Sequence, residues 1–427
     1  MLSRALFEIT KESPTRRALI SRYYSRAANE LREATTPYRR GCLGIVLSVL
    51  KNIGVGEVAL VAAEGPHAQA GGLAQAITGI TKALSTCGVS VSLITPLYEN
   101  AQGERHRNAS EIIRDGILVS GQRVPLRYLG QAKVSIGAVY DKKSRNLEHS
   151  PVLVPLEVYL AERRNVRIFF LRHGKFFDGL YSNATSDEQL RRAIVLSRGV
   201  LEIVADRHFD LKPHILVSHD WHAGLVPILL RADGKYHLSQ QLQSIECVHM
   251  LHNCGKDYQG RFPFQSANED FWPLLGLAGE HRFGLVDPGN EHFINITAGA
   301  IFHAKKVVTV SRPYAEQLLT EEGGEGLHVL LQEKKNLVFG ISNGIDLVEL
   351  RKTVWGKSRE KATSFSGHAG FSLEQFKSQT KLEVQADFGL EVNPDALLIS
   401  FIGRIVEQKG ISLLLQPPRG EQQPLLE

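Results

Sequence analysis

Short apolar segments alternate with helical patterns along most of this chain, and the alternation restricts the possible folds more than any other feature. The first example is an apolar run at 57–63 (EVALVAA), a helical pattern at 74–87 that Gly88 ends, and a second apolar run at 89–95. A strand, a helix and a strand in this order form a βαβ unit, which predicts a parallel sheet with a right-handed crossover. The pattern recurs, with strands expected at 166–171, 214–218, 244–251, 307–311 and 338–342, and helices at 187–206, at 224–231 and from Pro313. The sequence therefore predicts an α/β fold with one large doubly wound, Rossmann-like domain.

Changes in composition divide the chain into four predicted parts. These are a leader at 1–53, the doubly wound domain at 54–346, a linker of mixed charge at 347–394, and the start of a second Rossmann-like domain at 395–427. The last part opens with an apolar run at 396–403 (ALLISFIG), which has the character of a central strand in a parallel sheet. Pro417 and Pro418 end the helix expected after it. One buried strand cannot close a core, so we expect the second domain to be truncated, or this segment to dock on something outside the chain.

The bulk composition excludes several classes of protein. The formal net charge of +5 over 427 residues is too small and too evenly spread to indicate a nucleic-acid partner. No segment has the ~20 consecutive apolar residues that cross a bilayer, so no membrane partner is expected. Four cysteines do not form a disulfide framework in a chain of this length. The Arg- and Ser-rich segment 1–42 resembles an organelle presequence, although its four glutamates oppose that reading. A cytoplasmic location, or a plastid or other organelle if the basic N-terminus is a transit peptide, is expected.

Ligands of open α/β sheets bind at the carboxyl ends of the strands, so the residues that follow each strand are the candidate site. Gly71 and Gly72 follow the first strand and precede a helix, where a phosphate can approach backbone N–H groups. A simple turn is the alternative for this glycine pair. Arg404 and Lys409 follow the run at 396–403, where two cations suit a diphosphate, with a solvated charged loop as the alternative.

The strand at 214–218 is followed by the sequence His219-Asp220-Trp221-His222. Two histidines around an aspartate suggest metal ligands, but the sequence shows no obvious third ligand, so no metal site is expected. We expect instead a polar cluster that faces a sugar, with the Trp221 ring available for stacking. The alternative places Trp221 in the core and makes Asp220 a helix N-cap. The strand at 244–251 is followed by His252-Asn253 and then by Tyr258, which completes the candidate cluster.

The order and spacing of these motifs resemble the starch and glycogen synthases, which are retaining glucosyltransferases of the GT-B fold. The resemblance extends from about residue 57 to 413 and rests on AGGLAQAITGITKAL, HDWHAGLVPILL, LHN followed by YQGRFP, AGAIFHAKKVVTVSRPYAEQL, GISNGID and DALLISFIGRIVEQKG. It implies transfer of glucose from ADP-glucose or UDP-glucose to the non-reducing end of an α-1,4-glucan, with no metal and no cofactor beyond the donor. The HDWH and HN/YQG motifs argue against a sucrose or trehalose-phosphate type of synthase.

The resemblance also implies roles for individual residues. His252 matches the family's histidine beside the donor glucose, and Asn253 matches its neighbour. Asp220 and Trp221 match acidic and aromatic residues that affect turnover and the shape of the active site, and His222 and Tyr258 are expected to bind donor or acceptor. The basic pair Arg404 and Lys409 matches the two residues that bind the donor diphosphate. A fixed pair of cations stabilises the negative charge that builds on the leaving phosphate.

Two family positions are substituted in this chain. Gln69 stands where the family has lysine, and Gln75 stands where it has an acidic residue. Loss of one charge-assisted contact costs a few kcal/mol. Nothing after Gly410 matches the rest of the family's second domain. The leading hypothesis is therefore a synthase of this type whose chain, taken alone, transfers no glucose. The alternative is a non-catalytic glucan-binding or regulatory relative.

Overall fold

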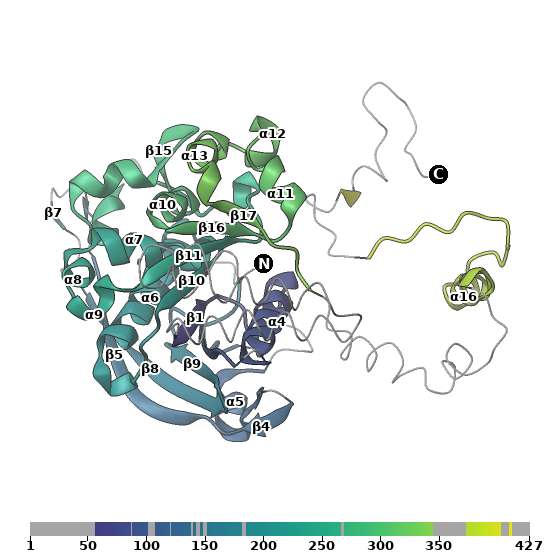
Figure 1. The fold of residues 1–427 in the computed structure, drawn as a ribbon, viewed down its shortest axis with the longest axis horizontal. Coiled ribbons are helices and arrows are strands. Elements are labelled where there is room, and N and C mark those ends of the chain that lie inside the picture. Colours follow the sequence, from purple (N-terminus) through teal and green to yellow (C-terminus); the bar gives the residue numbers. More distant parts are fainter. Residues whose placement is uncertain are drawn as a thin grey trace, which may run out of the picture. The chain divides into compact units, whose positions relative to one another are not determined.

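A nine-stranded sheet forms the centre of the described structure (Figure 1). The computed structural model describes residues 56–86, 88–100, 107–119, 121–137, 140–141, 146–147, 152–181, 185–265, 269–344, 373–402 and 410–411. In spatial order the strands are β17 (Val338–Gly340), β16 (Lys306–Thr309), β11 (Glu246–Leu251), β10 (Ile215–His219), β1 (Glu57–Val61), β2 (Ser90–Pro96), β9 (Val166–Arg172), β8 (Val152–Arg163) and β5 (Arg127–Ile136). The first seven are parallel to one another, whereas β8 is antiparallel to both β9 and β5.

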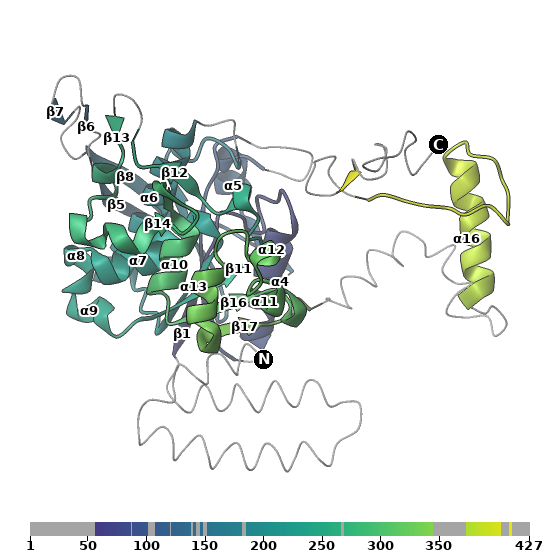
Figure 2. The same ribbon diagram turned by 90° about the horizontal axis from the view of Figure 1, so that it is seen from above.

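Helices cover both faces of this sheet. Alternate residues of β1 belong to two different hydrophobic clusters, because successive side chains of a strand point to opposite faces. The cluster on one face includes α4 (Gly72–Thr86) and α5 (Ala109–Asp115), and the other includes α6 (Ser186–Ala205) and α7 (Leu225–Ala232). A third cluster joins α10 (Ile296–His303) to α13 (His328–Glu333), which lie near each other in both views (Figures 1 and 2). This is the doubly wound α/β fold that the sequence predicts.

Shorter elements connect these layers. The remaining helices among the described residues of the first unit are α8 (Gly234–His237), α9 (Gln240–Gln243), α11 (Arg312–Gln317) and α12 (Glu321–Gly324). The remaining strands are β3 (Ile117–Val119), β4 (Gln122–Val124), β6 (Tyr140–Asp141), β7 (Asn146–Leu147), β12 (Arg261–Pro263), β13 (Glu269–Asp270), β14 (Val286–Asp287) and β15 (Asn290–Asn295). The 3-10 turns are η1 (Arg207–Phe209), η2 (Trp221–Ala223), η3 (Lys256–Tyr258), η4 (Trp272–Leu275), η5 (Gly279–Leu285) and η6 (Lys335–Leu337).

The strands and helices predicted within 57–342 are confirmed, apart from shifts of one or two residues at most ends. The sequence does not predict the long antiparallel pair β5 and β8 at one edge of the sheet. The burial of β8 alternates along much of its length between core and more exposed positions, so it lacks the continuous apolar run by which the central strands are recognised.

The chain divides into two compact units, Met1–Ile345 and Asp346–Glu427. In the second unit, helix α16 (Leu373–Asp387) lies within the segment that the sequence predicts as a linker. The predicted strand at 396–403 is wrong for its described part, since residues 397–402 have no regular structure, and Leu397 and Ile402 are 84% and 95% exposed. A strand forms only by hydrogen bonding to a neighbouring strand, and none of the described strands pairs with this segment. The predicted leader at 1–53 lies outside the described residues.

Candidate active site

The candidate site lies where three neighbouring parallel strands end. Strands β1, β10 and β11 are adjacent in the sheet, so their carboxyl ends meet at one edge. Glu64 follows β1, His219 is the last residue of β10 with Asp220 next, and His252 follows β11 directly. The structure therefore brings together the residues predicted after β10 and β11, His219 among them, and it adds Glu64 to them.

The rings of His219 and His252 form a hydrogen-bonded pair. His219 Nδ1 lies 2.9 Å from His252 Nε2, and the ring centroids are 5.2 Å apart. His219 is fully buried, and burial lowers its pKa well below the usual value, with the nearby His252 and His249 adding to the effect. Burial likewise lowers the pKa of His252 to about 4. Both imidazoles are therefore neutral at physiological pH.

Asp220 connects the ends of β10 and β11. Its Oδ1 accepts a hydrogen bond of 2.7 Å from the backbone N–H of His252, and its own N–H donates to the Met250 carbonyl at 2.9 Å. Its φ of 53° lies in the left-handed region, which costs on the order of 1 kcal/mol outside glycine. Asp220 makes no side-chain N-cap bond to the turn that follows, so the structure does not support the N-cap interpretation.

The carboxyl group of Asp220 is buried, with 2% of the residue exposed. Burial raises its pKa to about 7, and backbone hydrogen bonds from His252 and Asn253 oppose this rise. A carboxyl group with this pKa exists in both protonation states near neutral pH. Strained backbone and a perturbed pKa at one residue are typical of a functional position.

An aromatic cluster lies beside Asp220. The Trp221 and His222 rings stack with centroids 3.8 Å apart, and His222 contacts the rings of Tyr181 at 5.2 Å and Tyr258 at 5.7 Å. Trp221 is only 8% exposed and packs against Phe262, so it belongs to the core, as the alternative interpretation has it. The expectation of an open Trp221 face is not supported. Tyr181, at 39% exposure, is the exposed ring of this cluster.

Glu64 organises the start of helix α4. Its Oε2 accepts hydrogen bonds from the backbone N–H groups of Ala70, Gly71 and Ala74 at 3.2, 3.3 and 3.2 Å. These groups lie at the N-terminal end of a 15-residue helix, where unpaired N–H groups and the helix dipole favour an anion. The sequence predicts this site for a phosphate at Gly71 and Gly72, but here a carboxylate of the chain itself binds there. The substituted positions Gln69 and Gln75 flank the same turn, half-buried and exposed respectively.

Glu64 also joins this helix to the aromatic cluster. Its Oε1 accepts a hydrogen bond of 2.7 Å from the Tyr181 hydroxyl, which lies 3.3 Å from the Tyr258 hydroxyl. The sequence analysis did not single out Glu64 or Tyr181. Glu64 directly follows the strand that the sequence predicts at 57–63, so the same rule identifies it. Tyr181 has a φ of 51°, an unusual conformation for tyrosine that its sequence does not indicate.

Three further predicted residues have different outcomes. Asn253 Oδ1 accepts a hydrogen bond of 2.9 Å from the Gly255 N–H, which shapes the turn after β11. Arg404 and Lys409 lie outside the described residues, so the diphosphate clamp stays a prediction.

Within the described ranges no group of three or more His, Cys, Asp or Glu side chains is arranged to hold a metal ion. No helix in the described part of the chain is long and apolar enough to cross a membrane.

Gly260 supports the Trp221 ring, and a methyl group there is expected to destabilise the domain. Its φ is 64°, and a Cβ would lie 2.9 Å from Trp221 side-chain atoms. Gly260→Ala is expected to lower the free energy of unfolding by about 2–3 kcal/mol, from the left-handed backbone and the overpacking together. Gly88→Ala is the matched control, because Gly88 has a φ of 82° and no atom within 4 Å of an added Cβ. Urea denaturation of both variants measures the difference, and equal losses would show that Trp221 moves aside freely.

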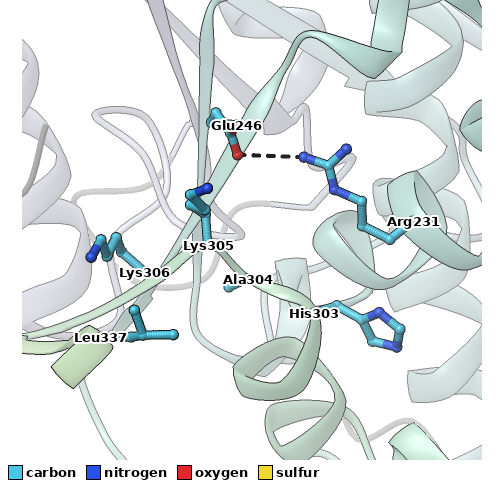
Figure 3. A pocket seen from close by; sticks show the side chains of 7 residues that line it. All are labelled: Arg231, Glu246, His303, Ala304, Lys305, Lys306 and Leu337. Carbon is cyan, nitrogen blue, oxygen red and sulfur yellow. Dashed lines mark hydrogen bonds and ion pairs between the residues drawn. The ribbon is translucent and has the colours of Figure 1, made fainter. Parts of the chain in front are cut away.

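A separate cavity lies at the amino ends of the strands, opposite the candidate active site (Figure 3). It has a volume of about 360 Å³ and is lined by Arg231, Glu246, His303, Ala304, Lys305, Lys306 and Leu337. Glu246 begins β11 and Lys306 begins β16, so this cavity is at the amino ends of the strands. The Arg231 guanidinium and the Glu246 carboxylate are 3.5 Å apart and offset each other's charge. The cavity is therefore not part of the candidate active site.

The fold and the site together define the first unit as a Rossmann-like α/β domain with a polar and aromatic site at the carboxyl ends of its parallel strands. Residues 57–333 match the family model described as the starch synthase catalytic domain. The match covers more than half of the chain, and the chain belongs to this family.

Individual relatives agree with this assignment. Glycogen synthase 2 of Geobacter sulfurreducens is 30% identical over 373 residues, covering 84% of this chain and 65% of that protein. Granule-bound starch synthase 2 of Pisum sativum is 28% identical over 383 residues, covering 86% of this chain and 44% of that protein. The solved catalytic domain of Starch Synthase IV from Arabidopsis thaliana, bound to ADP and acarbose, superimposes with a TM-score of 0.53 at 25% identity, covering 79% of this chain and 60% of that one. The chain thus spans less than two thirds of the length of each of these relatives.

Proposed function

We propose that this chain serves a glucosyltransferase of the starch and glycogen synthase type. The enzyme moves glucose from a nucleotide-glucose donor to the non-reducing end of an α-1,4-glucan. The observation that carries the proposal is the cluster of Asp220, His219 and His252 at the carboxyl edge of a starch synthase catalytic domain. The named relatives support the same activity.

The proposed roles follow from the surroundings of each side chain. Asp220 fixes the backbone of His252, so the imidazole is presented at the edge where donor glucose is expected. Tyr181 and Tyr258 offer aromatic faces and hydroxyl groups to a glucan, since sugars bind through ring stacking and hydrogen bonds. Arg404 and Lys409 are proposed to hold the donor diphosphate. ADP-glucose is the first donor to test, because the Arabidopsis relative is bound to ADP.

The names of two relatives suggest a cellular location for which the protein can be tested. Two plant relatives carry names that assign them to chloroplasts or amyloplasts, namely the Pisum sativum protein and soluble starch synthase 1 of Solanum tuberosum. A plastid location for this chain is a proposal.

The test measures binding and transfer separately on the purified chain. Calorimetry with maltohexaose reports glucan binding, and incorporation of labelled glucose from ADP-glucose or UDP-glucose reports transfer. Transfer would establish the enzyme and refute the expectation that this chain alone is inactive. Binding without transfer would favour the glucan-binding relative, and absence of both would contradict the proposal for this chain.

Tyr181 is expected to carry part of the glucan affinity. Tyr181→Asn removes the ring while keeping a residue that tolerates the left-handed backbone. Loss of one stacking ring costs about 0.5–1.5 kcal/mol, so the maltohexaose Kd is expected to rise by about 2- to 12-fold. Tyr128→Asn is the control, because Tyr128 is 52% exposed on the edge strand β5. An equal rise in both variants would show that the effect is not specific to the aromatic cluster.

A further inference from the structure

The paired imidazoles of His219 and His252 define a proton arrangement that goes beyond the proposed roles. Both rings are neutral, so each carries one proton on one of its two nitrogens. The contact of 2.9 Å between His219 Nδ1 and His252 Nε2 needs a proton on one of these two atoms and a lone pair on the other. Only two arrangements satisfy this condition, and they differ in what His252 presents on its other nitrogen.

The environment of His219 distinguishes the two arrangements. Its second nitrogen, Nε2, is buried and has no hydrogen-bond partner among the described residues. If His252 Nε2–H donated, neutral His219 would carry its proton on Nε2 as a buried, unpaired N–H. If His219 Nδ1–H donates, Nε2 is a bare acceptor instead. A buried N–H group without a partner is rarer than a buried acceptor without a partner, and it costs more free energy. The arrangement in which His219 Nδ1–H donates to His252 Nε2 is therefore favoured.

The neighbouring groups do not reverse this preference. His249 also faces the pair and is neutral, because burial lowers its pKa to about 3, and its Nδ1 lies 2.8 Å from the Ser218 hydroxyl. The Asp220 carboxylate is engaged by the His252 backbone N–H. Neither of these neighbouring groups therefore requires a proton on His219 Nε2.

We propose that His219 is a positioning residue that donates from Nδ1 to Nε2 of His252 and so holds His252 as the Nδ1–H tautomer. The Nδ1 atom of His252 has no partner among the described residues and is not enclosed, unlike Nε2 of His219. His252 therefore offers a fixed N–H donor to an oxygen atom of a ligand at the carboxyl edge of the sheet. The meaning of this donor for sugar transfer rests on the proposed function, whereas the tautomer itself does not.

Long-range ¹H–¹⁵N correlation spectra of the full chain, labelled with ¹⁵N-histidine, report which ring nitrogen carries the proton. His252→Gln and His219→Asn assign the two signals. The wild-type protein is expected to show His252 protonated on Nδ1, and a proton on Nε2 would overturn the proposal without any variant.

Two variants of His219 test the positioning role. His219→Asn keeps an N–H donor near the position of Nδ1 and is expected to retain the His252 tautomer. His219→Leu removes the donor, so His252 is expected to shift toward the Nε2–H form or to a mixture. An unchanged tautomer in His219→Leu, with a native-like spectrum elsewhere, would overturn the proposal. Because the spectrum reads the proton directly, failure of the sugar-transfer assay would count against the proposed function and not against this pairing.

Discussion

Replacement of Asp220 by asparagine is expected to stabilise the folded domain at pH 8. Burial raises the pKa of this carboxyl group to about 7. Between the unfolded pKa near 3.8 and the folded value, the unfolded chain releases the proton while the folded chain retains it. The stability that the protonated group contributes is therefore present below about pH 4 and is lost as the pH rises through 7. Asparagine has no such proton and still accepts the hydrogen bond from the His252 N–H.

The expected size of the effect follows from the shift of about three pKa units. At pH 8 the variant gains at most about 4 kcal/mol relative to wild type, and at pH 4 the two are nearly equal. Urea denaturation at both pH values measures the stability difference.

Asp210→Asn is the matched control for this titration. Asp210 also has a left-handed φ, of 47°, but its side chain is 74% exposed, and Lys212 lowers its pKa. Its replacement is expected to give no gain at pH 8. If Asp220→Asn is no more stable than wild type at pH 8, the carboxyl group is not protonated in the folded protein near neutral pH.

The parts of the fold that the sequence predicts are those with continuous apolar runs. Strands β1, β10 and β11 are buried along their whole or nearly their whole length, so their sequences distinguish them from helices and loops. The site follows from the same strands, because the sheet topology places the residues after them at one edge. His252 and Asp220 meet for this reason, although nothing in the sequence indicates that the Asp220 carboxylate bonds to the His252 backbone.

The features that the sequence does not predict depend on contacts between distant residues. The run at 396–403 is apolar, but apolarity without a neighbouring strand does not form a strand. Trp221 is buried because His222 and Phe262 pack against it, which the local sequence does not indicate. The glycine pair after β1 predicts a phosphate site, but the sequence could not show that the Glu64 carboxylate accepts hydrogen bonds at this turn.

Removal of the Glu64 carboxylate is expected to have a large effect on stability. In Glu64→Ala, three backbone N–H groups at the start of α4 and the Tyr181 hydroxyl lose their acceptor. Hydrogen bonds to a charged group contribute about 1.5–3 kcal/mol each, and water replaces part of this at the exposed Ala70 and Gly71. The free energy of unfolding is therefore expected to fall by about 3–5 kcal/mol, as measured by urea denaturation.

In Glu64→Ala the backbone N–H groups of Ala70, Gly71 and Ala74 are left without the Glu64 carboxylate, so an added anion can bind to them. Formate carries the same carboxylate group and fits a helix N-terminus, so it is expected to restore part of the stability of Glu64→Ala, while chloride at equal ionic strength is not. Wild type is expected not to respond, because Glu64 already binds these N–H groups. Glu64→Gln keeps an oxygen acceptor without the charge and is expected to lose less stability and to gain nothing from formate. If formate stabilises wild type and Glu64→Ala equally, the anion binds elsewhere. If inorganic phosphate stabilises only Glu64→Ala, the phosphate site predicted at Gly71 and Gly72 is present in the backbone, and Glu64 is what closes it to exogenous anions.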